Sequence, residues 1–447
     1  MVQWLGSTGI FILICIIIIA LVIDISIVRI ATSIGGLGQS YIALFIGTVL
    51  VFGVGQYAIL AFVKSEHKFI EYKISSHITG RRLLDSAVTV SQYALLAILV
   101  SVILQMVFTS SYHVFSLRAI IFISYGLSFI LLALLAKRFF SWFKSNRNMV
   151  VLVYMLAITT LSINSIFAII YTNNEFDTGL TVIHNIKSLT GGFESSDIIF
   201  GSAYTLTSVL SFILMWAATI LLLKHYSRRI GRAKYWIAVG IPLAYFLSQF
   251  QPLFLYSFGD LRLENPVLFG IVYNLIYTIA KPAGGILFGI AFWTIAKNLS
   301  NQNVKKYMLI SAFGMMLLFT ANQPTFLILT PYPPFGLVTV SFMGLASYLF
   351  YLGIYSASIS VSEDTKLRQS IRKAAIKEST EFLDSIGTAE MVQEIERRVV
   401  SMTRATKENI EKETGISSSF DEEDIREYLQ EAIQEIKRVR NKGNHQI

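Results

Sequence analysis

The sequence has little charge for its length. Only 15% of its 447 residues are Asp, Glu, Lys or Arg, whereas 54% are hydrophobic. A water-soluble chain of this size needs many more charged residues to cover its surface, so the composition argues against a soluble protein. There is a single cysteine, Cys15, and it lies inside an apolar run. One cysteine excludes an internal disulfide framework and supports no inference about redox compartment.

Recognisable catalytic motifs are also missing. The sequence contains no HExxH, no P-loop, no Gly-x-Ser-x-Gly and no pair of membrane aspartates suited to intramembrane proteolysis. Its six histidines are scattered, and no two have the spacing of metal ligands. The sequence therefore predicts a protein that is not an enzyme and that uses no metal or other cofactor.

Long apolar runs are what the sequence does have. Each contains about 18 or more residues with few or no charges, enough to cross about 30 Å of hydrocarbon as a helix. Ten such runs have the approximate limits 8–30, 40–63, 87–108, 118–136, 149–171, 201–223, 235–257, 267–296, 307–330 and 336–360. No strand-type alternation separates them, which excludes a transmembrane β-barrel. The sequence predicts an all-α, polytopic membrane protein with about ten transmembrane helices.

Lysine and arginine are unevenly divided among the loops. Loops 64–86, 137–148, 224–234 and 297–306 hold seventeen of them, and the alternate loops hold four. Positive charge collects on cytoplasmic loops, so a cell-membrane protein with both termini in the cytoplasm is predicted. The basic surplus then lies beside anionic lipid headgroups, and no nucleic-acid partner is needed to explain it.

The chain changes character near residue 360. Residues 1–360 form the predicted transmembrane domain, whereas residues 361–447 contain 18 acidic and 15 basic residues with helical periodicity. This pattern predicts a cytoplasmic helical tail, arranged as a short bundle or coiled coil, with a break at Gly387. Residues 362–447 are also the segment through which a cytoplasmic protein partner would bind.

One apolar run, residues 267–296, contains a lysine and a proline side by side. Lys281 falls near mid-depth, where a charge costs about 2.5–3.5 kcal/mol unless it faces protein, water or a partner. Pro282 removes a backbone donor and predicts a kink in the same helix. A charged residue and a helix break therefore coincide in the middle of the predicted bundle.

Amide side chains accompany proline in two neighbouring runs. Gln251 precedes Pro252, and Asn322 and Gln323 precede Pro324. Amides and an ammonium group can bond the carbonyls that prolines leave free, so we expect these residues and Lys281 to form a polar pocket that opens outward.

Two interpretations of this pocket stay open. In one, Lys281 is the charge of a site for a small molecule, an ion or a proton. In the other, its ammonium is a structural plug for the carbonyls at the kinks. Asp24 is the only carboxylate well inside an apolar run, which makes it a candidate partner of Lys281 in either case.

The junction between the last apolar run and the tail, "SASISVSEDTKLRQSIRK" from Ser356 to Lys373, resembles the same junction in a group of uncharacterised archaeal multi-pass membrane proteins. The resemblance implies an architecture only and transfers no catalytic residues.

Three function classes fit the sequence. The helical tail favours a sensor or receptor that couples the outward-facing pocket to a cytoplasmic partner. The kinked runs and Lys281 favour a secondary transporter or a channel. A structural subunit of a membrane complex, with the tail as its docking element, is the third.

Overall fold

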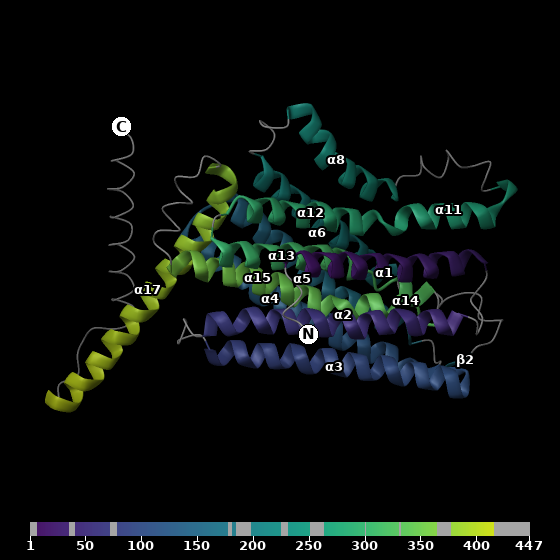
Figure 1. The fold of residues 1–447 in the computed structure, drawn as a ribbon, viewed down its shortest axis with the longest axis horizontal. Helices are drawn as coiled ribbons and strands as arrows, with labels where there is room; N and C mark the ends of the chain where they lie inside the picture. The colour runs from purple at the N-terminus through teal and green to yellow at the C-terminus, as the bar shows by residue number, and fades with distance from the viewer. Residues whose placement is uncertain are drawn as a thin grey trace.

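The structure is a computed structural model. It describes residues 7–34, 41–71, 78–177, 181–184, 198–224, 231–250, 263–299, 301–329, 332–363 and 377–414. The helices in these ranges are α1 (Ser7–Ile34), α2 (Ile42–Glu71), α3 (Ile78–Thr109), α4 (Val114–Ser145), α5 (Met149–Glu175), α6 (Ile198–Leu223), α8 (Arg232–Ser248), α11 (Pro266–Thr278), α12 (Ala280–Lys297), α13 (Gln302–Ala321), α14 (Phe326–Leu329), α15 (Leu337–Glu363) and α17 (Lys377–Thr414). Most run side by side along the long axis of the molecule (Figure 1).

Eight helical segments among the described residues are long and apolar enough to cross a membrane. The prediction of an all-α, polytopic helical membrane protein is therefore confirmed at the level of architecture. The predicted runs 8–30 and 235–257 correspond to α1 and α8. Within the part of α1 whose side chains the structure describes, the apolar segment is Ile12–Val28, and α8 has 17 residues, so neither is counted among the eight. The count of ten spans stays a prediction.

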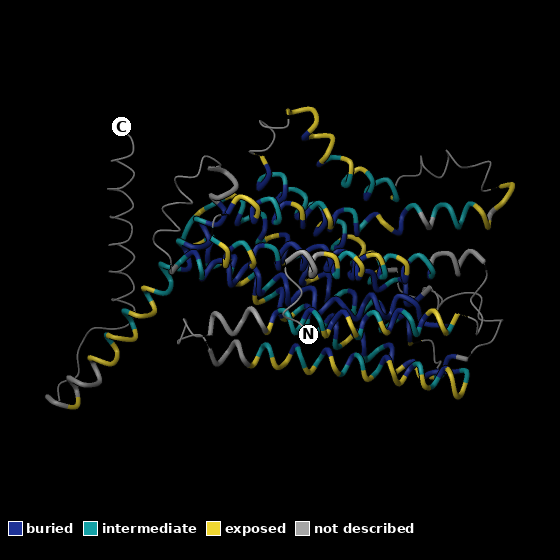
Figure 2. The backbone as a smooth tube through the Cα atoms, viewed as in Figure 1, coloured by how far each residue is buried: buried dark blue, intermediate teal, exposed yellow. Residues whose placement is uncertain are grey.

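Helices α13 and α15 form the centre of the bundle. Figure 2 shows both as almost continuously buried, whereas α3, α8 and the far part of α17 carry many exposed residues. Their axes approach closely because Gly314 of α13 lies against the backbone of Phe350 in α15, and Gly353 of α15 lies against Ser311 in α13. Small residues at helix crossings allow this contact, and van der Waals packing between membrane helices depends on it.

A short two-stranded antiparallel sheet, whose strands are separated in sequence by α4 and α5, closes one end of the bundle, which we call the β end. Strand β1 (Ser111–His113) pairs with β2 (Val182–His184), so that Tyr112 lies opposite Ile183. The ring of Tyr112 stacks on that of Tyr332, with ring centroids 6.1 Å apart. The connection between α3 and α4 is thereby tied to the segment that precedes α15.

The predicted kink at the Lys281-Pro282 pair is present. Helix α11 ends at Thr278 and α12 begins at Ala280, with Ile279 between them. Pro282 has no backbone N–H to bond the carbonyl of Thr278, the residue four positions before it, which explains why the helix is interrupted here. The interruption lies within the single predicted run 267–296.

The predicted break at Gly387 is wrong. Helix α17 passes through this glycine without interruption, from Lys377 to Thr414. Gly387 lies against Val361 of α15, at a distance too short for a side chain. The glycine therefore serves close helix packing here instead of ending a helix.

The first half of α17 is packed into the opposite end of the bundle, which we call the α17 end. Phe382, Leu383 and Ile386 are fully buried. The predicted continuation of α15 into the tail, at 364–376, and the predicted tail helix beyond residue 414 lie outside the described residues. The part of the tail that the structure describes thus begins as a component of the membrane domain's core.

Gly314→Ala is expected to lower stability by about 1–3 kcal/mol, because a Cβ at this position would lie 2.5 Å from the backbone N of Phe350. Gly126→Ala on α4 is the matched control, since its Cβ would meet nothing within 4 Å. Thermal unfolding of both variants in detergent checks the prediction. Equal melting temperatures for the two would contradict close packing between α13 and α15.

Candidate functional site

Helix α13 ends inside the bundle, at the break that was predicted before Pro324. Asn322 follows its last residue, Ala321, and Pro324 comes two positions later. In a continuous helix the N–H of Phe326 would bond the carbonyl of Asn322, but here it bonds the carbonyl of Gln323. The break therefore leaves the Asn322 carbonyl available to another donor in a buried position.

The ammonium of Lys281 fills this role. Its Nζ donates to the carbonyl oxygen of Asn322 at 3.0 Å and to the hydroxyl of Tyr204 at 3.3 Å. Nζ also lies 5.5 Å from the centroid of the Tyr204 ring, a cation–π distance. Lys281 itself is half-buried. These contacts are of the kind that the structural interpretation of Lys281 requires, since an ammonium group bonds a carbonyl freed at a kink.

A relay of amides extends this contact across the bundle. The side-chain Nδ2 of Asn322 donates to Asn164 Oδ1 at 3.0 Å, and Asn164 Nδ2 donates to the backbone carbonyl of Tyr204 at 3.0 Å. The hydroxyl of Tyr125 donates to Asn322 Oδ1 at 3.4 Å. We call Lys281, Asn322, Asn164, Tyr204 and Tyr125 the polar node. It joins α4, α5, α6, α12 and the end of α13.

The other predicted pocket residues lie in different places. Pro282 is buried beside Lys281 at the start of α12. Gln323 is also buried, and its Nε2 donates to the carbonyl of Thr320, a local bond at the end of α13. Gln251 lies outside the described residues. The structure thus brings Lys281, Pro282 and Asn322 together, with Gln323 adjacent in sequence.

Asp24 does not pair with Lys281, which corrects that prediction. Its Oδ2 accepts hydrogen bonds from the backbone N–H groups of Gly336 at 3.1 Å and Thr339 at 3.2 Å, and from the Thr339 hydroxyl at 2.7 Å. Thr339 lies in the first turn of α15 and Gly336 directly precedes the helix, where N–H groups have no partner within the helix. Asp24 is therefore a cap for α15 supplied by α1, and the positive end of the helix dipole favours its charge.

Three residues of the polar node were not predicted as site residues. Asn164, Tyr204 and Tyr125 lie inside apolar runs, and the signal that marks Asn164 is an amide within such a run. Tyrosine gives no comparable signal, because the chain has 21 of them. Their role depends on contacts between residues 40 to 197 positions apart.

Two further amides in the bundle were also missed, and they lack partners. Both amide atoms of Gln92 on α3, and Oε1 of Gln56 on α2, are buried without a hydrogen bond. The two residues lie at a similar depth, since Gly53, one turn from Gln56, lies against Leu96, one turn from Gln92. A buried polar group without a hydrogen-bond partner costs about 1–3 kcal/mol. These two amides therefore lower the stability of the fold when no water reaches them.

Lys281 lines neither of two cavities whose walls consist of described residues. One, of about 410 Å³, lies between α3 and α4 near the β end, with Gln105, His113 and Phe115 in its wall. The other, of about 400 Å³, lies between α4 and α17. Within the described part of the chain, no three His, Cys, Asp or Glu side chains are grouped so that they could hold a metal ion.

Comparison with protein-family models, curated proteins and solved structures found no match for this chain. The resemblance of the segment Ser356–Lys373 to archaeal membrane proteins therefore stays a prediction. Function has to be inferred from the geometry of the polar node, the cavities and α17.

Asn322→Leu is expected to destabilise the protein by about 1–3 kcal/mol, because it removes the acceptor of Tyr125 and the donor to Asn164 inside the bundle. Gln323→Leu is the control, since it removes only a local bond to Thr320. Thermal unfolding in detergent measures both. A larger loss for Gln323→Leu would show that the amide relay is not a main support of the bundle.

Gln92→Leu is expected to stabilise the protein by about 1 kcal/mol or more, because it removes two buried polar atoms that have no partner. The melting temperature in detergent should rise. A lower melting temperature would mean that the Gln92 amide is hydrogen-bonded to water or to another group. The interpretation that its two polar atoms have no partner would then be wrong.

Proposed function

We propose that this protein is a receptor-like multi-pass membrane protein in which α17 carries the output. The observation that supports this proposal is the position of Phe382 on α17. Its ring lies 6.5 Å from that of Phe292 on α12, 6.3 Å from that of Phe139 on α4 and 5.5 Å from that of Tyr154 on α5. One residue of the tail thus contacts three membrane helices at once.

The same three helices supply residues of the polar node. Lys281 lies on α12, Tyr125 on α4 and Asn164 on α5. Helices are stiff over this length, so a change in the hydrogen bonds at the node shifts or rotates their far ends against Phe382. A two-state rearrangement of the node is in this way transmitted to α17 through contiguous packing.

A polar contact gives the docking of α17 a fixed geometry. Glu390 is buried, accepts a hydrogen bond from the indole N–H of Trp142 at 2.8 Å and lies 3.8 Å from the guanidinium of Arg138. Arg138 also donates to the hydroxyl of Tyr355 on α15 at 3.2 Å. A buried charge with few partners favours one docked position over intermediate ones, which suits a discrete switch.

The proposal places α17 in the cytoplasm. The α17 end of the bundle carries the basic loop 137–148, and positive charge marks the cytoplasmic side of membrane proteins. The output partner is a cytoplasmic protein that binds residues 362–447, and the input is a small molecule or an ion that changes the node.

A second candidate is a structural subunit of a membrane complex. It is favoured by the contacts of Lys281, whose ammonium already bonds the Asn322 carbonyl and the Tyr204 hydroxyl without any ligand. A transporter or channel gains support from the interrupted helices alone. We therefore rank this function third.

Lys281→Met tests the coupling, because it removes the donor to Asn322 and leaves the apolar stem in place. Spin labels are attached at Arg147→Cys on the α4–α5 connection and at Ser401→Cys on α17, both exposed, in a Cys15→Ser background. We expect the distance distribution between the labels to shift or broaden. Pulsed electron paramagnetic resonance in nanodiscs is the measurement.

The matched control is Ile286→Met, an exposed position on the same helix, which should leave the distribution unchanged. Tyr204→Phe is the milder variant, since it removes one acceptor and keeps the ring. If the folded variants at Lys281 and Tyr204 leave the labels unmoved, the receptor-like proposal fails. If Lys281→Met unfolds and folded Tyr204→Phe changes nothing, the structural-subunit candidate is favoured instead.

A further inference from the structure

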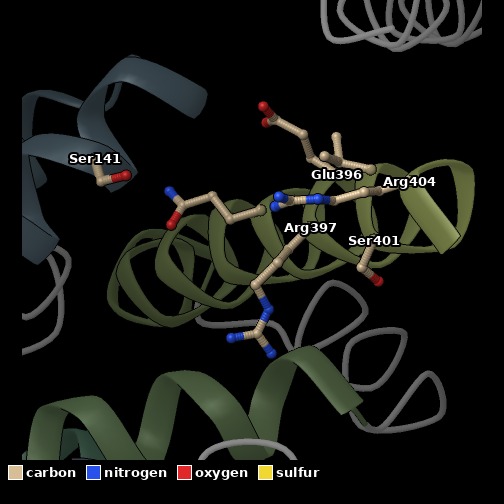
Figure 3. Close-up of a pocket in the computed structure, with 7 residues that line it drawn as sticks. Ser141, Glu396, Arg397, Ser401 and Arg404 are labelled. Carbon is tan, nitrogen blue, oxygen red and sulfur yellow. The ribbon is translucent and has the colours of Figure 1, made fainter. Parts of the chain in front are cut away.

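The cavity between α4 and α17 has a polar, positively charged wall. Helix α4 contributes Ser141, and α17 contributes the other side chains (Figure 3). The polar lining residues are Ser141, Gln393, Glu396, Arg397, Ser401 and Arg404. Two guanidinium groups and one carboxylate leave a net positive charge in a space of about 400 Å³.

The cavity lies at the level where α4 leaves the hydrocarbon. Ile130 and Leu134 are exposed apolar residues on α4, and Lys137 and Ser141 follow them on the same helical face. An apolar stripe that ends in a lysine is typical of the boundary between lipid tails and headgroups. Ser141 therefore opens the cavity towards the headgroup layer.

Arginine is well suited to recognising a phosphate at this boundary. Its planar guanidinium offers several N–H donors that match two phosphate oxygens at once. Arg397 is oriented by Glu394, with Nη2 and Oε2 2.8 Å apart. The hydroxyls of Ser141 and Ser401 add neutral donors on two sides of the space.

The same helix carries an exposed apolar stripe beside Arg398, on the face opposite Arg397 and Arg404. Ile395 and Met402, seven positions apart and therefore on one face of α17, have exposed fractions of 44% and 65%. A helix with basic residues beside such a stripe is typical of segments that lie at a membrane surface. This stripe lies on the far side of α17 from the cavity, so the apolar surface next to the cavity is that of Ile130 and Leu134 on α4, which a free phosphate ion would not use.

We propose that this cavity binds the phosphate of an anionic lipid headgroup in the cytoplasmic leaflet. Arg397 and Arg404 donate to the phosphate oxygens, and the serine hydroxyls complete the donor set. Bound lipid holds α17 against the end of α4, because the site takes residues from both helices. The site goes beyond the proposed function and does not require the polar node to change.

The experiment compares lipid retention by the full-length protein. Purified protein in detergent is titrated with phosphatidylglycerol or phosphatidylcholine, and bound lipid is counted by native mass spectrometry. The double variant Arg397→Gln, Arg404→Gln should bind phosphatidylglycerol on the order of tenfold more weakly, since each basic residue contributes about 1 kcal/mol near an anionic surface. Its binding of phosphatidylcholine should change much less.

Arg398→Gln is the matched control, because Arg398 lies on the same helix, is exposed and does not line the cavity. An equal loss in this control would show that general surface charge attracts the lipid, and the proposal would fail. Competition by inorganic phosphate at concentrations similar to those of the lipid would instead identify a free-anion site, which overturns the lipid assignment. If the double variant does not fold, Ser401→Asp at an exposed position tests the same cavity and should weaken binding comparably.

Discussion

A single hydrogen bond, from the ammonium of Lys281 to the backbone carbonyl of Asn322, joins two helix interruptions that would each be unfavourable alone. The carbonyl lacks a partner in the helix because the chain breaks at Pro324 and the Phe326 N–H bonds Gln323 instead, and the lysine lies at the kink that Pro282 makes. In hydrocarbon the ammonium and the carbonyl both need a hydrogen-bond partner, and here the ammonium donates to the carbonyl. The amide relay through Asn164 and the Tyr204 hydroxyl then extends this match to the surrounding helices.

The helices that meet at this node meet again at the other end of the bundle. There Phe382 and Glu390 of α17 lie among residues of α4, α5, α12 and α15, so the first half of the tail is held by both ring packing and a buried charge. The second half differs, because its arginines and exposed apolar residues face a cavity and the surroundings of the bundle. One helix therefore combines a fixed segment with a segment available for binding.

The sequence predicted the parts of the structure that follow from local chemistry. Long apolar runs predicted the membrane helices, and Pro282 predicted the interruption between α11 and α12. The pairing of Asp24 could not be predicted, because its donors lie more than 300 positions away and two of the three are backbone N–H groups. Gly387 was misassigned because a glycine can either end a helix or allow a close crossing, and only the position of Val361 distinguishes the two. Nothing in the sequence distinguished Tyr204 from the other tyrosines as a site residue.

The capping of α15 by Asp24 has a consequence for how the chain is made. Synthesis delivers α1 long before the residues around Gly336, so this carboxylate is made well before the groups that bind it. A lone carboxylate there is costly, which disfavours the final packing of α1 until α15 arrives. A helix made early is thus among the later ones to reach its final position, and chains cut short before α15 lack the groups that bind this carboxylate.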